Sequence, residues 1–364
     1  MHLFVYEHIT GGGLAGAPLP SSLAREGWAM LTAIVEDLLR IRNVHVTITV
    51  DERYAGGGDL PPSERLVVRD VSSANAAEEA FASCARECNG VLIIAPETHG
   101  VLLEKTRRAL DLNAEVFGSA PEAIRLTGDK LECARFLEQH DVPCIPAVEY
   151  RSDVNPPFDA PWVVKPRDGA GTTDTLLLNS AGAQHLHDLR FESEAIVTPF
   201  CEGVAASVLC VVCDATILTF APAAQCVEMG ERLRYVGGQV PLSSELIDRA
   251  IRLGCRAVSA VPTLRGFVGV DLILGTDDRV VEINPRLTTS YVGLRRLTRD
   301  NLAACWLSVL RGNEVAGPCW DDGEVVFSPS RAARAADFIP TPANDEEFLD
   351  PTGRPDSPGN SGSR

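Results

Sequence analysis

Lysine is almost absent from this sequence. The 33 basic residues include only Lys105, Lys130 and Lys165, and all the others are arginines. An ammonium is a compact, reorientable charge, whereas a guanidinium is a rigid fork, so a lysine at a given position needs its own explanation. A place on a solvated face is enough to explain Lys105. The motifs around Lys130 and Lys165 favour a functional explanation.

Long apolar runs and an excess of positive charge are also missing. No stretch approaches the roughly 18 apolar residues needed to span a bilayer, and the N-terminus lacks a basic start followed by an apolar run. We therefore expect a cytoplasmic protein without a membrane segment. The formal net charge of −17 argues against a nucleic-acid binder, because phosphate backbones attract clustered Lys and Arg.

Disulfides are not expected either. The eleven cysteines follow no regular spacing, which predicts reduced thiols. Cys210 and Cys213 have the spacing of a redox or zinc pair, but they lie in an apolar, strand-like run with no second pair nearby.

Apolar residues make up 45% of the 364 residues, which is ample for two or three linked cores. Over 1–120, strands alternate with helices in β-α-β order, which predicts an α/β domain with a parallel sheet. Residues 121–200 predict a small lobe and 201–335 a larger one, each mixing helices and strands. Residues 336–364 are rich in Pro, Asp, Gly and Ser, and we expect them to be disordered.

The individual elements follow from apolar periodicity. Strands are predicted over residues 3–6, 44–50, 91–95, 161–165, 175–178, 195–199, 205–213, 266–274 and 279–283. Helices are predicted over residues 22–40, 76–88, 101–113, 127–140, 181–189, 244–261 and 294–310.

Two glycine-rich loops follow predicted strands. The first begins at Glu7, at the carboxyl end of a strand where open α/β sheets bind ligands, so Glu7 is a candidate substrate contact. A plain connector explains this loop equally well. The second loop can offer backbone N–H groups and hydroxyls to phosphates. Its candidate residues are Gly169, Gly171, Thr172 and Thr173.

The most specific signal is a predicted hairpin with acidic residues on both strands. A tight turn centred on residues 276–277 would place Asp271 opposite Glu282. Asn284 would project from the same face, because side chains alternate with period two. Opposed carboxylates repel by up to about 1 kcal/mol, and a divalent cation reverses that sign. Such ligands suit Mg²⁺ bound to nucleotide phosphates, with Mn²⁺ as the alternative ion, unless the acids simply face water.

Lys130 and Lys165 supply the positive charge that a triphosphate needs. With the glycine loop and the late Asp…Glu-x-Asn set, the chain resembles the ATP-grasp superfamily over residues 121–312. The resemblance implies an α/β protein with the ATP-grasp fold, in which two α+β lobes hold ATP behind a Rossmann-like pre-ATP-grasp domain. It also implies that both lysines contact phosphates and that Asp271, Glu282 and Asn284 hold magnesium.

The same resemblance implies a hinge that binds adenine. The segment over residues 196–200 is similar to the one whose backbone meets the base, so Thr198 belongs to the site and Phe200 packs on the ring. Many members of the superfamily place a ribose-binding Glu shortly after the hinge glycine. This chain departs from that pattern after Gly203, and Glu202 is the candidate for the ribose contact.

Residues 282–294, together with residues 202–207, are similar to the tyramine:L-glutamate ligase family of methanofuran biosynthesis and its bacterial relatives in one-carbon metabolism. This implies that ATP phosphorylates a glutamate γ-carboxylate and that tyramine or a related amine attacks the acyl phosphate. The alternatives are another ATP-grasp amino-acid or dipeptide ligase and a nucleotide-binding protein without turnover. The expected partners are an amino acid and an amine, and a homodimer is expected only by analogy.

Several polar residues are candidates for catalysis or substrate binding. Arg286 follows the metal ligands and, with Lys165, is a catalytic candidate for stabilising the γ-phosphate and the oxyanion, unless it only pairs with a neighbouring acid. Arg232 and Arg234 are candidates for the substrate carboxylate. Ser290 is a candidate for the amine pocket, although helix capping and packing explain it equally well.

Overall fold

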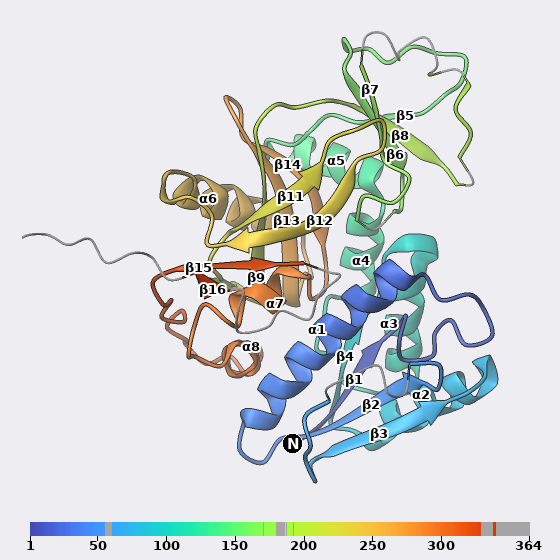
Figure 1. The fold of residues 1–364 in the computed structure, drawn as a ribbon, viewed down its shortest axis with the longest axis vertical. Helices are drawn as coiled ribbons and strands as arrows, with labels where there is room; N and C mark the ends of the chain where they lie inside the picture. The colour runs from blue at the N-terminus through green and yellow to red at the C-terminus, as the bar shows by residue number, and fades with distance from the viewer. Residues whose placement is uncertain are drawn as a thin grey trace, which may run out of the picture.

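The structure is a computed structural model of the chain (Figure 1). It describes residues 1–54, 60–169, 171–179, 186, 188–191 and 193–328, and the backbone of Phe338–Ile339. Three sheets form three structural parts: an N-terminal domain, a small lobe and a C-terminal lobe. None of the described helices is long and apolar enough to cross a membrane.

The N-terminal domain is built on a four-stranded parallel sheet in the order β3-β2-β1-β4. Apolar strands alternate with amphipathic helices, as the sequence predicted, although β3 was missed because its side chains are mostly exposed. The strands are β1 (His2–Glu7), β2 (His45–Asp51), β3 (Leu66–Val71) and β4 (Gly90–Ile94). The helices are α1 (Ser21–Arg40), α2 (Ala74–Glu87), η1 (Thr98–Gly100) and α3 (Val101–Asp111).

The small lobe carries an antiparallel sheet in the order β5-β8-β6-β7. It has a small core of its own around Trp162 and Val164. Two short helices lead into it, α4 (Pro121–Gly128) and α5 (Lys130–Gln139). Its strands are β5 (Val148–Glu149), β6 (Trp162–Pro166), β7 (Leu176–Leu178) and β8 (Ala195–Pro199).

The C-terminal lobe is built on an eight-stranded sheet in the order β14-β13-β9-β11-β12-β15-β16, with β10 paired to β9. The predicted strands β9 and β13 form its centre. The strands are β9 (Val204–Cys213), β10 (Thr216–Thr219), β11 (Ala223–Glu228), β12 (Arg234–Val240), β13 (Gly266–Leu274), β14 (Arg279–Asn284), β15 (Glu324–Phe327) and β16 (Phe338–Ile339). The helices are α6 (Ser244–Ala260), α7 (Ser290–Leu294) and α8 (Leu302–Leu310).

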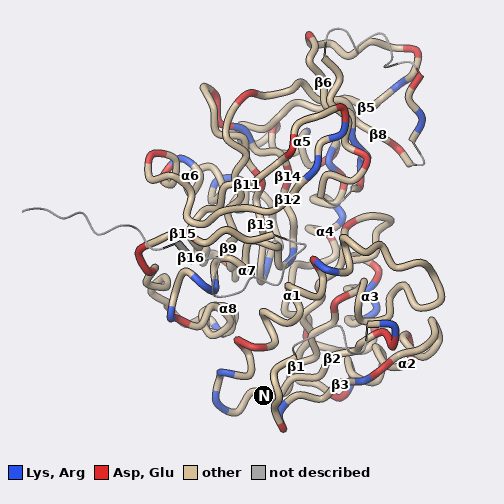
Figure 2. The backbone as a smooth tube through the Cα atoms, viewed as in Figure 1, with Lys and Arg blue, Asp and Glu red and all other residues tan. Residues whose placement is uncertain are grey.

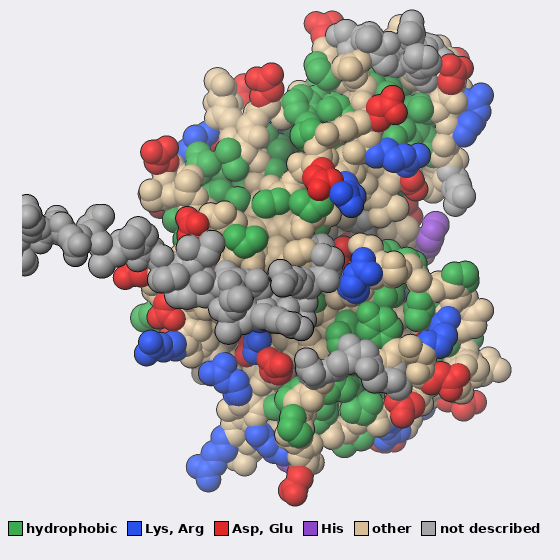
Figure 3. Space-filling view, in the orientation of Figure 1, with side chains coloured by type: hydrophobic (Ala, Val, Ile, Leu, Met, Phe, Trp, Pro, Cys, Tyr) green, Lys and Arg blue, Asp and Glu red, His purple; other side chains and the backbone are tan. Residues whose placement is uncertain are grey.

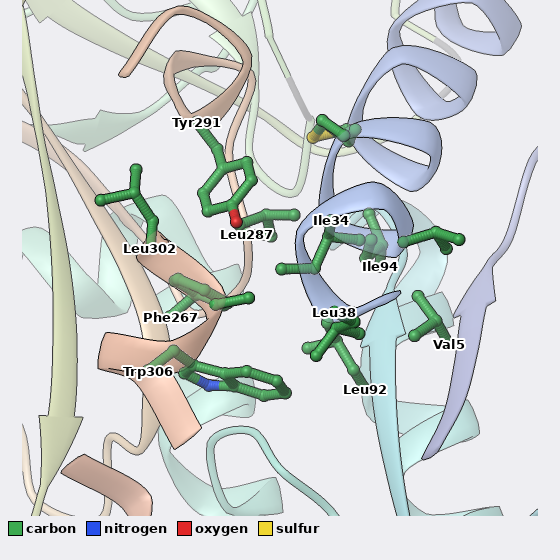
Figure 4. Close-up of a cluster of buried hydrophobic side chains, with 14 of the residues drawn as sticks. Val5, Ile34, Leu38, Leu92, Ile94, Phe267, Leu287, Tyr291, Leu302 and Trp306 are labelled. Carbon is green, nitrogen blue, oxygen red and sulfur yellow. The ribbon is translucent and has the colours of Figure 1, made fainter. Parts of the chain in front are cut away.

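One apolar core joins the N-terminal domain to the C-terminal lobe (Figure 4). Ile34 and Leu38 on α1 face Phe267, Tyr291 and Trp306 of the C-terminal lobe. Trp306 is fully buried and stacks on Phe267, with ring centroids 5.1 Å apart. These two parts of the chain therefore share their packing, whereas the small lobe packs around a separate core.

The prediction of one helix over residues 294–310 is wrong. The chain leaves α7 after Leu294 and re-enters a helix at Leu302. The break lies at Asn301, whose side chain accepts a hydrogen bond from the Ala304 N–H at 3.0 Å and so begins α8 as an N-cap.

Most of the predicted helix over 181–189 and most of the predicted tail over 336–364 lie outside the described residues. Within that tail, Phe338–Ile339 pairs with β15 as β16.

Charged residues of both signs lie where the three parts meet. Figure 2 shows basic and acidic positions together around α5, β12 and β14. On the face drawn in Figure 3, the described Lys and Arg side chains are interspersed with Asp and Glu rather than gathered into one basic patch.

Candidate active site

The β13–β14 hairpin places two carboxylates opposite each other. Asp271 pairs with Glu282 and Gly269 with Asn284, as the alternation of side chains predicted. The turn is not the symmetric one that the sequence suggested, because beyond Asp271 the register shifts by one residue through a bulge. The bulge lies on the turn side of the pair, so Asp271, Glu282 and Asn284 still share one face.

The neighbouring strands add two polar residues that the sequence did not reveal. Gln225 on β11 donates from Nε2 to Asp271 Oδ1 at 2.9 Å. Ser207 lies opposite Asp271 on β9 and donates its hydroxyl hydrogen bond to the same carboxylate. Asn284 Nδ2 donates to Asp271 Oδ2 at 3.1 Å. Three hydrogen-bond donors therefore hold the Asp271 carboxylate in place. In the sequence, the only sign of this was Ser207, a polar residue within the otherwise apolar run of β9.

The electrostatics of the two carboxylates differ. Burial and the nearby charge of Glu282 raise the pKa of Asp271 from 3.8 to about 7. Burial also opposes ionisation of Glu282, but the ammonium groups of Lys130 and Lys165 outweigh it and lower the pKa of Glu282. The site thus holds one firmly ionised carboxylate and one whose ionisation needs a further positive charge.

Lys130 and Lys165 supply the cationic side of the cluster. Lys130 Nζ lies 3.1 Å from Glu282 Oε2 and also donates to the Gly169 carbonyl. Burial and the neighbouring Lys130 ammonium lower the pKa of Lys165, while Glu282 and Asp271 oppose this change. Lys130 thus contacts the carboxylate pair directly, and the Lys165 ammonium lies within electrostatic reach of it.

The start of α5 is what positions Lys130. The carboxylate of Asp129 caps this helix by accepting from the N–H groups of Leu131 and Glu132, at 3.1 and 2.9 Å. It also binds the Arg167 guanidinium through Nε and Nη2, at 2.9 and 2.7 Å. Arg167 lies two residues after Lys165, so this pair fastens the start of α5 to the end of β6.

The donor set suits a magnesium–nucleotide complex. Two carboxylates and the side-chain amide of Asn284 converge, and burial together with the charge of Glu282 raises the pKa of Asp271, which a divalent cation would counteract. The described residues include no group of three or more His, Cys, Asp or Glu side chains placed to hold a metal. An ion here would therefore complete its coordination with phosphate oxygens and water, as Mg²⁺ commonly does.

The predicted phosphate loop lies between the small lobe and its neighbours. Gly171 has a φ of +63° and nothing within 4 Å of an added Cβ, and Thr173 is exposed. Thr172 Oγ1 accepts a hydrogen bond from the Tyr235 N–H at 2.8 Å. Asp168 Oδ2 accepts one from the His99 N–H, also at 2.8 Å. The loop thus contacts both the C-terminal lobe and the N-terminal domain.

The predicted adenine hinge leads from β8 of the small lobe toward β9 of the C-terminal lobe. Thr198 is buried on β8, and the Phe200 N–H donates to the Pro161 carbonyl at 2.8 Å. Glu202 is exposed. Gly203 has a φ of +152°, and an added Cβ there would lie 2.6 Å from the Leu274 carbonyl oxygen, so this close approach requires glycine.

Arg286 pairs with an acid from another domain. Its Nε and Nη2 donate to the two carboxylate oxygens of Glu97, at 2.9 and 3.0 Å. An ion pair with a neighbouring acid was the alternative prediction for Arg286, but Glu97 is 189 residues away in the chain. The effect of Glu282 and Asp271 on the pKa of Arg286 places its guanidinium within electrostatic reach of the cluster.

Four predicted substrate contacts have partners outside the Asp271–Glu282 pair in this structure, and two of them are arginines. Arg232 forms an ion pair with Asp174 and Arg234 one with Glu228, and both arginine side chains are 70% exposed. Alternation along β12 turns Tyr235, not Arg234, toward the cluster. Burial and the carboxylates of Glu26 and Asp271 raise the pKa of Tyr235, which agrees with that placement.

Glu7 and Ser290 are the other two, and both side chains make local hydrogen bonds. The Glu7 carboxylate is buried and accepts hydrogen bonds from the Ile9 N–H, the Thr10 N–H and the Thr10 hydroxyl. The Glu7 carboxylate therefore stabilises the loop that directly follows β1. Ser290 is buried at the first turn of α7, where its hydroxyl is 3.0 Å from Thr288 Oγ1. Packing and local hydrogen bonding account for it.

Comparison with known proteins agrees with this architecture. Residues 127–290 match the family described as ATP-grasp domain, and residues 44–124 match the pre ATP-grasp 3 domain. A solved structure described as a putative ATP-grasp superfamily protein from Archaeoglobus fulgidus superposes with a TM-score of 0.66 at 24% identity, covering 90% of this chain and 92% of that one. L-amino acid ligase from Bacillus licheniformis gives 0.60 at 15% identity, covering 88% and 75%. At these identities the likeness to solved structures concerns the fold alone.

Two curated relatives are similar in sequence. Tyramine–L-glutamate ligase from Methanocaldococcus fervens is 26% identical over 283 residues, which cover 77% of this chain and 86% of that protein. The enzyme of the same name from Methanocaldococcus jannaschii is 25% identical over 285 residues, covering 78% and 82%. The matched domains and the three-part structure show that the chain has the ATP-grasp fold, with a pre-ATP-grasp domain ahead of the ATP-grasp domain.

Proposed function

We propose that this protein is an ATP-dependent ligase that joins a carboxylate to an amine through an acyl phosphate. The observation that carries the proposal is the convergence of Lys130 and Lys165 on the Asp271–Glu282 pair. Two ammonium groups neutralise phosphate oxygens, while two carboxylates and an amide attract a divalent cation. Few sites other than a magnesium–nucleotide site need both at once.

The chemistry follows from the poor leaving group of a free carboxylate. Transfer of the γ-phosphoryl group from ATP converts the carboxylate oxygen into part of a phosphate, which can leave when an amine attacks. Asp271, Glu282 and Asn284 would hold a magnesium ion, which would supply positive charge to neutralise the phosphates. Lys130 and Lys165 then stabilise charge on the transferred group, and Arg286 stabilises the oxyanion that forms on attack. The small lobe excludes water, since an exposed acyl phosphate would hydrolyse.

The proposed substrates are based on the names of similar proteins. The two curated relatives are named for tyramine and L-glutamate, and one structural neighbour is named as an L-amino acid ligase. We propose glutamate as the carboxylate substrate, with its γ-carboxylate activated, and tyramine or a similar amine as the acceptor. Methanofuran-type cofactor biosynthesis is the corresponding pathway. Another amino-acid or dipeptide ligase of the same fold is the second candidate.

A substrate panel tests both levels of the proposal. Purified protein with Mg²⁺ and ATP is assayed for ADP release with glutamate and tyramine, with glutamate and other amines, and with pairs of amino acids, and products are identified by mass. We expect one ADP and one phosphate per amide, with ¹⁸O from labelled glutamate carboxylate appearing in the phosphate. Release of AMP would refute the acyl-phosphate route, and ATP binding without turnover for any pair would favour a non-catalytic nucleotide-binding protein.

A further inference from the structure

The Arg286 guanidinium is held by a carboxylate that the N-terminal domain supplies. Glu97 follows β4, at the carboxyl end of the parallel sheet, and reaches Arg286 just after β14. Both hydrogen bonds are short, and the side chains are only 13% and 5% exposed for Arg286 and Glu97. This is a two-point contact, in which the planes of the guanidinium and the carboxylate fix each other's orientation.

The same guanidinium lies near the acids of the cluster. Arg286 follows Asn284 by two residues, directly after β14, the strand that also carries Glu282. Its remaining hydrogen bond, from Nη1, is a long one of 3.3 Å to the Leu287 carbonyl. Of these hydrogen bonds, the two that Arg286 makes with a carboxylate both go to Glu97, although Glu282 is on the preceding strand.

The pairing of Arg286 with Glu97 affects whether Asp271 and Glu282 are free to bind a metal ion. Without Glu97, a buried guanidinium beside Glu282 and Asp271 would pair with them, because an unpaired buried charge costs several kcal/mol. It would then occupy the oxygens that a divalent cation needs. Held by Glu97, Arg286 keeps its charge close to the reacting groups while the oxygens of Asp271 and Glu282 stay available.

We propose that Glu97 is the positioning residue for Arg286, holding its guanidinium toward the acyl oxyanion and away from the metal-binding carboxylates. The inference rests on the proposed ligase function, and it makes the N-terminal domain a working part of the site. Nothing in the sequence indicated it, because Glu97 lies in the turn after a buried strand and its partner is distant in the chain.

A double-mutant cycle tests the proposal in turnover. Glu97→Gln keeps the shape but removes the charge, and we expect it to lower kcat about 100-fold, the effect of losing one oriented oxyanion donor. If Glu97 acts through Arg286, the double variant Glu97→Gln with Arg286→Gln is no slower than Arg286→Gln alone. Losses that multiply would overturn the proposal, because they would mean that Glu97 acts independently.

Metal binding gives a second readout that needs no turnover. Mn²⁺ is titrated into each variant with ADP present, and free Mn²⁺ is measured by electron paramagnetic resonance. We expect at least tenfold weaker Mn²⁺ binding in Glu97→Gln, because released Arg286 competes for Asp271 and Glu282. Binding should return to the wild-type level in the double variant. Unchanged Mn²⁺ binding in Glu97→Gln would contradict the proposal.

The controls separate this idea from misfolding and from failure of the proposed function. Glu115→Gln removes another N-terminal carboxylate facing an arginine of the C-terminal lobe, Arg265, at 3.8 Å, and should change neither readout. If Glu97→Gln does not fold, Glu97→Asp, which keeps the charge on a shorter side chain, takes its place with the same expectations in weaker form. If no substrate pair yields product, the Mn²⁺ titration alone still decides the role of Glu97.

Discussion

At the residue scale, the scarcity of lysine makes the lysines of the cluster stand out. Three lysines occur in the chain, and two of them lie beside the Asp271–Glu282 pair. The sequence could predict these four residues, because strand alternation and the scarcity of lysine are both visible in it. It could not predict Gln225 or Glu97, whose roles depend on contacts between distant segments.

The two lysines of the cluster are testable against the third. Lys165→Met removes a buried ammonium at similar length, and we expect kcat for ADP release to fall at least 100-fold because charge on the transferred phosphoryl group loses its partner. Lys105→Met is the matched control, since Lys105 pairs with Glu78 at 2.8 Å and lies over Phe81 in the N-terminal domain. Equal activity of the two variants would refute the assignment of Lys165.

The Asp271–Glu282 repulsion predicts a pH-dependent stability in the absence of metal. The pKa of Asp271 is about 7 in the folded chain and has an ordinary value of 3.8, so the folded state binds the extra proton between these limits. Stability therefore falls as pH rises from about 4 to about 7, and the cost is complete above that. Asp271→Asn mimics the protonated form at every pH. At pH 8 we expect the free energy of unfolding of this variant to exceed that of the wild type by on the order of 2 kcal/mol, after a discount for the partial exposure of Asp271.

Thermal unfolding in a chelator measures this effect. The difference in Tm between Asp271→Asn and the wild type should be small at pH 5 and positive at pH 8. Saturating Mg²⁺ and ATP should stabilise the wild type and not the variant. A difference in Tm that does not change with pH would show that the two carboxylates do not interact as described.

At the element scale, the phosphate loop is fastened to the C-terminal lobe by a short backbone ladder. The Leu177 N–H donates to the Glu231 carbonyl at 2.9 Å, and the Leu233 N–H to the Thr175 carbonyl at 3.0 Å. Thr172 adds the contact with Tyr235. The apolar pattern predicted β6 and β8. It did not predict β12, because Gly237 and Gly238 interrupt the apolar pattern of that strand.

Loss of the Thr172 hydroxyl should weaken this docking. Thr172→Val keeps the volume and removes one hydrogen-bond acceptor, which is worth about 1 kcal/mol, or about a fivefold rise in KM for ATP. The control is Thr216→Val on the exposed end of β10. Steady-state kinetics decide between them, and an unchanged KM for ATP in Thr172→Val would mean that the contact does not support nucleotide binding.

At the scale of the whole molecule, α1 is fixed to the C-terminal lobe through Asp37. This buried carboxylate accepts from the Tyr291 hydroxyl at 2.7 Å and from Arg295 Nε and Nη2 at 3.0 and 2.8 Å. Its backbone carbonyl accepts from Asn301 Nδ2 at 2.7 Å. With the shared core of Figure 4, this makes the N-terminal domain and the C-terminal lobe one packing unit, whereas the small lobe has a separate core.

Breaking that link should be costly. Asp37→Ala leaves Arg295 buried without its main partner, and we expect a loss of about 3 to 5 kcal/mol in the free energy of unfolding. Glu36→Gln removes the neighbouring carboxylate that contacts the same arginine at 2.8 Å but is 38% exposed, and should cost less than about 1 kcal/mol. Urea unfolding compares the two. Similar losses would mean that Asp37 does not join the two parts.

The central claim is that Asp271, Glu282 and Asn284 bind the metal of a nucleotide complex beside Lys130 and Lys165. A crystal structure with Mn²⁺ and ADP tests it most directly, because the anomalous signal locates the ion. We predict one peak between the Asp271 and Glu282 carboxylates, about 2.1 Å from their oxygens, with the diphosphate next to both ammonium groups. An ion or diphosphate bound elsewhere would contradict the account.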